Sequence, residues 1–341
     1  MIYISAIILT ILCSLVVCSL SNKLGFVDSP DGIRKVHKGN IALGGGICLF
    51  SPLILCFYLF PDFSLSINDD VKIIVLCSLI ILFLGLLDDI KSLPISIRLI
   101  GQIITSWIII IITDLYVKDL GDLLGIGSIY LGELGIPITI FMVVGVTNAF
   151  NMLDGMDGLV SLVALVCFGG LSVITYLSGI ASPEFALISS VLFIFLLFNL
   201  GLFKRRWKIF LGDSGALWLG FLIAWTLVYL ASDENKLIEP VSAIWIILLP
   251  LIDALSTFIG RLRQGKPIFY GDRAHIHHAL LDSGLKKWKV LVIILIISLI
   301  SCSVIVFTTL YEVKEFYLFY GFLTIWLFYY LLLKYPLSKD L

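Results

Sequence analysis

The chain contains several blocks of about 20 apolar residues that no charge interrupts. An α-helix needs roughly 20 such residues to cross a bilayer core of about 30 Å, a length that a buried helix of a soluble protein does not require. The composition agrees, because 60% of the residues are hydrophobic and 14% are charged, against roughly 25% charged residues in typical globular chains. The blocks therefore predict an all-α, polytopic membrane helix bundle and exclude an ordinary soluble fold.

The apolar blocks define eleven expected membrane-spanning helices, which we expect to form a single integral membrane domain over residues 1–341. No repeat of roughly 20–50 residues is visible, which weighs against transporter folds built from inverted repeats. The expected helices cover residues 2–21, 41–60, 71–87, 98–117, 136–150, 158–179, 185–202, 214–231, 241–260, 290–310 and 316–333.

The loop charges predict the orientation of these helices. Of the 23 lysines and arginines, nineteen fall in one set of alternating loops, and the opposite set holds Lys72, Lys118, Lys236 and Lys314. Because positive charge accumulates in cytoplasmic loops, the first set is expected in the cytoplasm, with the N-terminus outside and the C-terminus inside. All four histidines then lie on the cytoplasmic side, and all six glutamates lie outside. Every cytoplasmic carboxylate is thus an aspartate at or near a helix end, as ligands of a site would be, so we expect the chemistry there.

The first polar motif, LGLLDDIKSLP, places Asp88 and Asp89 at the end of the third expected helix, directly after fifteen uncharged residues. Two adjacent carboxylates at the membrane interface are costly unless a cation or a positively charged partner offsets them. We interpret the pair as positioning an acceptor and a metal ion, with base catalysis by Asp88 as a weaker option. A solvated helix end is the alternative.

The second motif, NAFNMLDGMDGLV, lies between two expected helices. Asn148 and Asn151 are three residues apart, so their side chains share one face of a helix end. Asp154 and Asp157 each precede a glycine, which is typical of turns that allow close backbone approach. Oxygen ligands suit a hard cation such as Mg²⁺, whereas the spacing does not fit a calcium-binding EF-hand loop.

The third motif, KRRWKIFLGDSGALWLGF, places Asp213 between glycines at the start of the eighth expected helix, behind a basic run. The N-terminus of a helix presents backbone N–H groups to anions. Asp213 at this position is expected to hold a metal ion that bridges to phosphate. The alternatives are that Asp213 is a simple helix cap and that the basic run only sets the orientation.

Two further loops are cationic. RLRQGKPIFYGDRAHIHHALLDSG contains three histidines together with several basic residues, and DSPDGIRKVHKGNIALGGG adds more donors for phosphate. A zinc site is an alternative for H-x-H-H, but the glutamate of H-E-x-x-H is missing. Binding of a diphosphate explains the loops better, and a solvated basic loop is the other alternative. The residues concerned are Arg34, Lys35, His37, Arg261, Arg263, Lys266, Arg273, His275, His277 and His278.

Aspartates, asparagines and cations on one side of a membrane are the groups that phosphoryl transfer uses, with a divalent metal on the diphosphate. The setting implies a lipid substrate, and a lipid monophosphate is largely ionised at neutral pH because its second pKa is about 6. A strong general base is therefore unnecessary. A transporter or cation channel with an acidic vestibule and an inactive lipid-binding scaffold remain as alternatives, and no nucleic-acid partner is expected.

These motifs together resemble the polyprenyl-phosphate N-acetylhexosamine-1-phosphate transferases (glycosyltransferase family 4), and HIHH is similar to the WecA-like branch rather than the MraY branch. The match runs through almost the whole chain. The resemblance implies an eleven-helix bundle in the bacterial inner membrane with its active site in a cytoplasmic cleft. It also implies transfer of HexNAc-1-phosphate from a UDP-HexNAc to undecaprenyl phosphate with release of UMP. Such a reaction starts O-antigen, common antigen or teichoic acid synthesis.

The resemblance also implies substrates, a cofactor and roles for single residues. UDP-GlcNAc is the preferred donor, ahead of UDP-GalNAc, UDP-FucNAc and UDP-QuiNAc. The cofactor is Mg²⁺, with Mn²⁺ as an alternative, and a homodimer is left open. Two positions depart from the family pattern, Ser92 at the third acid of D-D-x-x-D and Ala42 at a usual proline. The metal ligands that the resemblance implies are Asn151 and Asp213. The motifs and the resemblance together give a catalytic group, which is Asp88, Asp89, Asp154, Asp157, His277 and His278. They also give a substrate-binding group, in which Asn148, Arg34, Lys35, His37 and Arg273 come from the motifs alone and Arg261, Arg263 and His275 are also implied by the resemblance.

Overall fold

The computed structural model describes the chain except residues 29–38, 181, 233–235, 268–274, 312 and 338–341, and it describes residues 333–337 by their backbone alone. The described part is almost entirely helical, as predicted. Its elements are α1 (Ile2–Leu24), β1 (Val27–Asp28), β2 (Ile41–Ala42), α2 (Gly45–Leu59), α3 (Pro61–Ser66), α4 (Asp69–Lys91), α5 (Ile95–Thr113), η1 (Gly132–Leu134), α6 (Gly135–Leu153), α7 (Leu159–Leu177), α8 (Pro183–Asn199), η2 (Arg205–Trp207), α9 (Gly212–Ala231), α10 (Pro240–Ile246), α11 (Leu248–Arg263), α12 (Ile276–Asp282), α13 (Lys287–Leu310) and α14 (Glu315–Leu337).

The expected membrane spans coincide with helices. Within the described residues, eight helices are long and apolar enough to cross a membrane, and a ninth results if the bent pair α10 and α11 forms one span. The two other expected spans coincide with the shorter apolar helices α2 and α8. The all-α membrane bundle is therefore confirmed, while the count of eleven crossings and the orientation stay predictions.

The expected ninth span, residues 241–260, is not one straight helix. It is broken between Ile246 and Leu248, and α10 and α11 meet at an angle of 86°. Pro250 lies in the first turn of α11. It has no N–H to donate to the carbonyl of Ile246, and its ring would clash with that carbonyl in a continuous helix. The break tilts α11 relative to α10, and α11 carries residues of both the apolar pocket and the candidate site.

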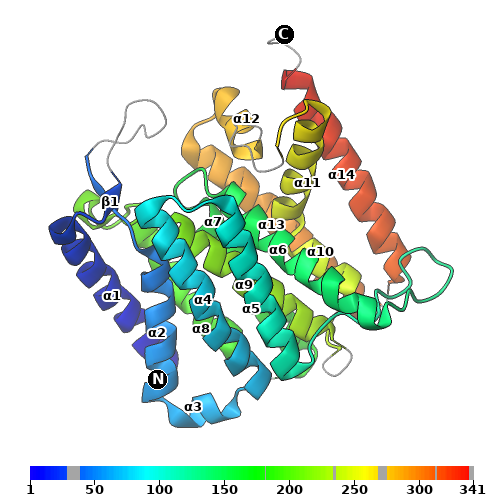
Figure 1. The fold of residues 1–341 in the computed structure, drawn as a ribbon, viewed down its shortest axis with the longest axis horizontal. Coiled ribbons are helices and arrows are strands. Elements are labelled where there is room, and N and C mark those ends of the chain that lie inside the picture. Colours follow the sequence, from blue (N-terminus) through cyan, green and yellow to red (C-terminus); the bar gives the residue numbers. More distant parts are fainter. Residues whose placement is uncertain (29–38, 181, 233–235, 268–274, 312, 338–341) are drawn as a thin grey trace.

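Helix α9 is the centre of the bundle, packed against α4 and α6 and also against α2 (Figure 1). Glycines make these contacts close. A Cβ on Gly45 would lie 2.6 Å from Cα of Leu211, and one on Gly46 would lie 2.9 Å from the carbonyl carbon of Ser214. Gly85 of α4 likewise abuts Ser214. Small residues allow membrane helices to approach backbone to backbone, so the start of α9 is held rigidly between α2 and α4.

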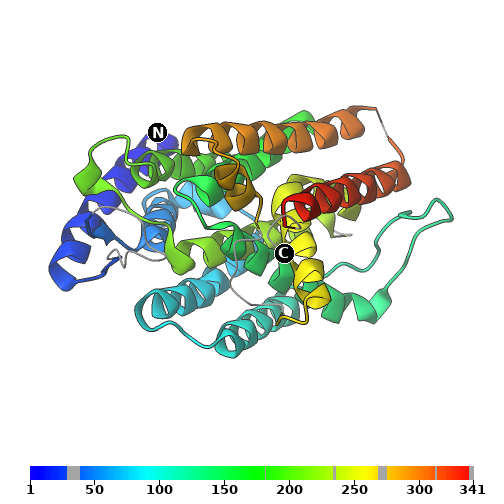
Figure 2. The same ribbon diagram turned by 90° about the horizontal axis from the view of Figure 1, so that it is seen from above.

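The polar motifs gather at one end of the bundle. In Figure 1, β1, α12 and the C-terminal end of α14 lie at the upper end, whereas the N-terminus and α3 lie at the lower end. Seen from above, α13 and α14 flank one side and α4 and α5 the opposite side (Figure 2). The two-residue strands β1 and β2 pair antiparallel. The N–H of Phe210 donates to the carbonyl of Ala42 at 2.9 Å, which ties the segment before α9 to the first polar loop.

Candidate functional site

Asp88 is a buried carboxylate at the end of α4. Its Oδ2 lies 2.6 Å from Nη1 of Arg98 on α5, and its Oδ1 accepts a hydrogen bond from the N–H of Leu93 at 2.6 Å. The side chain therefore closes the turn between α4 and α5, and it holds a cation at the edge of the site. A buried carboxylate needs such partners because water no longer solvates it.

Asp89, the next residue, faces a different helix. Its Oδ1 accepts a hydrogen bond from the N–H of Asp213 at 2.8 Å, and its Oδ2 accepts one from the N–H of Ser214 at 3.2 Å. These N–H groups belong to the first turn of α9, where no intrahelical acceptor exists. A carboxylate there also complements the positive end of the helix dipole. Asp89 thus caps α9 and fixes the backbone at Asp213.

Asp213 and Asn151 are brought together although 62 residues separate them in sequence. Nδ2 of Asn151 lies 2.5 Å from Oδ1 of Asp213. Asn151 is in the last turn of α6 and Asp213 is in the first turn of α9, so the contact follows from the close packing of these helices. Asp213 also lies close to Asp88 and Arg98. Three of the sequence motifs therefore converge here.

The loop between α6 and α7 adds Asp154 and Asp157. Asp157 Oδ2 lies 2.7 Å from Nζ of Lys208 and 3.9 Å from Nζ of Lys287. Asp154 has no ion-pair partner within the part of the chain that the structure describes. Burial raises the pKa of the Asp154 carboxyl well above its usual range, and the negative charges of Asp213, Asp89 and Asp157 raise it further. The site therefore holds more negative charge than its described cations offset.

The histidine segment, residues 275–278, lies against this acidic loop, residues 154–157. His277 is completely buried, and its ring occupies the space where a Cβ on Gly155 would stand, between Asp154 and Asp157. The ring of His275 is stacked on that of His277 with centroids 5.8 Å apart, and the ring of His278 lies 4.2 Å from His277. Glycine at position 155 is thus what allows the histidine segment to approach the acidic loop.

The comparisons with known proteins agree with this arrangement of motifs. Residues 71–231 match glycosyl transferase family 4, a range that contains all but the first two residues of α4, the acidic loop and α9. The chain is 34% identical to the undecaprenyl-phosphate α-N-acetylglucosaminyl 1-phosphate transferase of Salmonella typhi over 83% of this chain and 76% of that protein. It is 34% identical to the Haemophilus influenzae protein of the same name, over 91% of this chain and 87% of that protein. The chain belongs to glycosyl transferase family 4.

Further residues of this family 4 protein contribute to the site in ways that their sequence positions do not reveal. Arg98 and Lys208 are two of the nineteen positive charges from which the orientation was predicted, yet each pairs with an aspartate of the site. Asp253 on α11 lies 2.7 Å from Nδ1 of His275. An ionisable residue inside an apolar segment is a signal of function in membrane proteins; at Asp253 the signal was present, but its partners were not predictable.

The remaining expected site residues are placed as follows. Nδ2 of Asn148 donates to Oε1 of Gln102 at 2.7 Å and to the carbonyl of Val144 at 2.8 Å, so it links α5 and α6, and its substrate-binding role stays a prediction. Arg261 is buried in α11, and the guanidinium of Arg263 lies 5.1 Å from the ring of Tyr330. Four expected residues lie outside the described ranges: Arg34, Lys35, His37 and Arg273.

The donor set at the centre of the site fits Mg²⁺. Among the described residues, no three His, Cys, Asp or Glu side chains lie close enough to hold a metal ion by themselves. Mg²⁺ in proteins is, however, commonly held by one or two oxygen ligands together with substrate phosphates. The contact between Asn151 and Asp213 uses Nδ2 and Oδ1, which leaves an amide oxygen and a carboxylate oxygen outside that hydrogen bond. The uncompensated negative charge around Asp154 favours a cation at the same place.

Proposed function

We propose that this protein transfers GlcNAc-1-phosphate from UDP-GlcNAc to undecaprenyl phosphate, releases UMP, and so starts synthesis of a cell-surface polysaccharide of the O-antigen, common antigen or teichoic acid type. Membership of family 4 and the names of the relatives support the reaction. One structural observation supports assigning the reaction to this site. Asn151 and Asp213 meet beside the acidic loop, and His277 packs on that loop.

The reaction requires little covalent chemistry from the protein. A phosphate oxygen of the acceptor attacks the β-phosphorus of the UDP-sugar, the bond from this phosphorus to the bridging oxygen breaks, and UMP leaves with the electron pair. Positioning and charge stabilisation dominate such transfers. Arg98 and Lys208 are cations within the site, already oriented by Asp88 and Asp157, and the histidine segment supplies further donors.

Asn151 and Asp213 are the residues that would hold Mg²⁺. When bound, the ion supplies neutralisation of the diphosphate charge. Asp89 keeps Asp213 in place by holding the first turn of α9. Asp154 and Asp157 line the adjacent loop, where the nucleotide half of the donor is proposed to lie.

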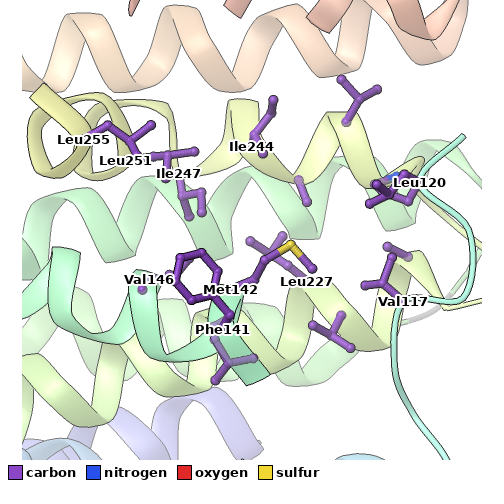
Figure 3. Close-up of a pocket in the computed structure, with 18 of the residues that line it drawn as sticks. Val117, Leu120, Phe141, Met142, Val146, Leu227, Ile244, Ile247, Leu251 and Leu255 are labelled. Atoms are coloured by element: carbon purple, nitrogen blue, oxygen red, sulfur yellow. The ribbon is translucent and has the colours of Figure 1, made fainter. Parts of the chain in front are cut away.

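An apolar pocket supports a lipid as the second substrate. It has a volume of about 350 Å³ and is lined by α6, α9, α10, α11 and α14, with side chains such as Met142, Val146 and Leu227 (Figure 3). Phe141 lines the pocket and is 78% exposed, so the pocket reaches the outer surface of the bundle. Val146 precedes Asn151 by five residues on α6, a rise of about 8 Å. A polyprenyl chain in this pocket would therefore end near the candidate metal ligands.

The location of the charges favours this function over transport. A transporter is expected to bind its substrate near the bilayer midplane, whereas Asp88, Asp89, Asp154 and Asp213 lie at helix ends on one side of the bundle. Asp253 lies deeper within its helix, but it contacts His275 of the histidine segment. We propose that the protein lies in the bacterial inner membrane with this end facing the cytoplasm, the side to which the positive charges of the loops assign it.

The test is release of UMP by the purified protein with undecaprenyl phosphate and Mg²⁺. UDP-GlcNAc, UDP-GalNAc, UDP-FucNAc and UDP-QuiNAc are supplied separately, and reactions without lipid or with EDTA are the controls. UMP is expected with UDP-GlcNAc and in neither control. UMP released from one of the other donors instead would correct the assignment of the donor sugar and leave the proposed type of reaction in place. No UMP with any of the four donors would refute the proposed function.

A further inference from the structure

A buried polar network joins three helices next to the candidate site. The carboxylate of Asp253 on α11 is 2% exposed. Its Oδ2 lies 2.7 Å from Nδ1 of His275, and its Oδ1 accepts hydrogen bonds from the N–H of Ile276 at 2.9 Å and from the hydroxyl of Tyr329 on α14 at 2.5 Å. Both carboxylate oxygens are thus engaged, and the three partners come from segments 22 to 76 residues away in sequence.

A carboxylate inside an apolar bundle needs an explanation. Removing it from water costs several kcal/mol unless hydrogen bonds and an opposite charge compensate it, and replacing such a group by an apolar one is often neutral or stabilising. Holding the three helices together therefore does not by itself explain why a carboxylate stands here. What it fixes is the start of α12, a helix of seven residues, which is too short to be stable alone and depends on its contacts.

The geometry leads from this network directly to the acidic loop. His275 precedes α12, and its ring is parallel to that of His277 with an interplanar angle of 1°. His277 in turn fills the space over Gly155. Because buried side chains are close-packed, a shift of His275 displaces His277 with it. An ionised carboxylate can only accept hydrogen bonds, so Asp253 places the hydrogen of His275 on Nδ1 and leaves Nε2 for another partner.

We propose that Asp253, supported by Tyr329, is a positioning residue that sets the tautomer of His275 and holds the histidine segment in the orientation that binds the diphosphate of the donor. This inference rests on the proposed function. Asp253 itself touches no substrate in this account and acts through His275. The recurring chemical precedent is a carboxylate that orients an imidazole through Nδ1 while Nε2 does the work.

Four variants separate positioning from a general structural role. Asp253→Asn keeps the shape and one acceptor oxygen but removes the charge. Tyr329→Phe removes one hydroxyl from the network, and Tyr320→Phe, an exposed position on the same helix, is the matched control. His275→Ala removes the group through which Asp253 is proposed to act, and it is also combined with Asp253→Asn.

The measurement is steady-state UMP release with each substrate varied in turn. Asp253→Asn is expected to lower kcat/KM for UDP-GlcNAc by about 10²-fold, the size of effect that a misplacement of about 1 Å produces, with the lipid KM unchanged. Tyr329→Phe is expected to cost roughly tenfold and Tyr320→Phe nothing. In the His275→Ala background, Asp253→Asn should cost less than about twofold, because residues that act through one another are not additive.

A readout without turnover accompanies the kinetics. Hydrogen–deuterium exchange of the peptide that covers residues 276–282 should be faster in Asp253→Asn than in the wild type, and binding of UDP measured by calorimetry should be weaker by a similar factor to the loss in kcat/KM. Any of three results would overturn the positioning role. These are additive effects of Asp253→Asn and His275→Ala, equal losses in kcat/KM for the two substrates, and unchanged UDP binding. An active wild type with an unimpaired Asp253→Asn variant would overturn this proposal alone. If the wild type binds UDP but releases no UMP, the proposed function is refuted. The comparison of UDP binding between the wild type and Asp253→Asn then still tests the positioning role of Asp253.

Discussion

Oδ1 of Asp89 accepts a hydrogen bond from the backbone N–H of Asp213 at 2.8 Å, across 124 residues of sequence. The first of these residues lies in the last turn of α4 and the second lies in the first turn of α9. The two neighbouring aspartates therefore have different partners. Asp88 pairs with Arg98 on α5, whereas Asp89 caps α9, the helix that carries a proposed metal ligand. Adjacent residues of one motif therefore act on two different helices.

Removing this cap should weaken both the fold and the metal site. Asp89→Ala is expected to lose about 1 kcal/mol of stability, as measured for other helix caps, and to weaken the apparent affinity for Mg²⁺ by about 10–100-fold, as for other residues that orient metal ligands. Thermal unfolding and a Mg²⁺ titration of UMP release measure the two effects. Asp69→Ala is the control at the opposite end of α4, where the ion pair with Lys72 is exposed and such pairs contribute little. Equal effects of the two substitutions would contradict the capping role.

The raised pKa of Asp154 predicts how stability depends on pH. The folded protein disfavours the carboxylate form relative to the unfolded chain, so without Mg²⁺ this group makes the fold more stable as the pH falls through its raised pKa. Asp154→Asn removes the charge and should raise the melting temperature at pH 8 by a few degrees, on the order of the shift that 1 kcal/mol produces, while turnover falls. The pH dependence of the melting temperature should flatten in this variant. A lower melting temperature at pH 8 would show that Asp154 is stabilised there by a partner.

Gly145 offers a direct test of the lipid pocket. It lines the pocket on α6, and a Cβ built there meets no atom within 4 Å. Gly145→Leu should fill the pocket, raise the KM for undecaprenyl phosphate by about tenfold or more through the lost apolar contact, and leave the KM for UDP-GlcNAc unchanged. Stability should not fall, because a helical glycine is about 0.5–1 kcal/mol worse than alanine. Gly169→Leu on α7, where a Cβ also has open space, is the control and should leave both KM values unchanged.

Much of the fold could be predicted from the sequence, because the length of each apolar block is enough to predict a helix at that place. The expected span 214–231 differs from α9 by two residues at one end. The break in the ninth span was missed although Pro250 marks it. Pro52 lies inside α2 without ending it, so proline alone does not decide the outcome, and the packing around each helix does.

The residues of the candidate site could be predicted from the sequence, but most of the contacts between them could not. Asn151 and Asp213 were expected to act together and do meet. The partners of Asp89, Asp157 and Asp253 lie far away in sequence, and only the packing of the helices brings them together. Local sequence shows which residues are unusual for a membrane segment, but it does not contain the distances between them.

Ser92, which replaces the third acid of the family motif, has a structural consequence of its own. It ends α4 with φ +50°, and its N–H donates to the carbonyl of Asp88 at 2.8 Å. This left-handed conformation costs a residue with a side chain about 1 kcal/mol. Ser92→Gly should therefore gain about 1 kcal/mol in thermal unfolding with activity within about twofold of wild type. Ser178→Gly at the end of α7, where φ is −80°, should lose stability instead; a gain at both positions would contradict the conformational explanation.

The central claim is that the sugar moves together with a phosphate at the site built around Asn151 and Asp213. UDP-GlcNAc labelled with ³²P at the β-phosphorus tests it most directly, with undecaprenyl phosphate and Mg²⁺ present and the lipid extracted after the reaction. With wild-type protein, the label is expected to enter the lipid fraction while unlabelled UMP is released, and Asp213→Asn is expected to abolish both. Label that remains in a released nucleotide while sugar enters the lipid, or an Asp213→Asn variant with normal transfer and unchanged Mg²⁺ dependence, would contradict the account.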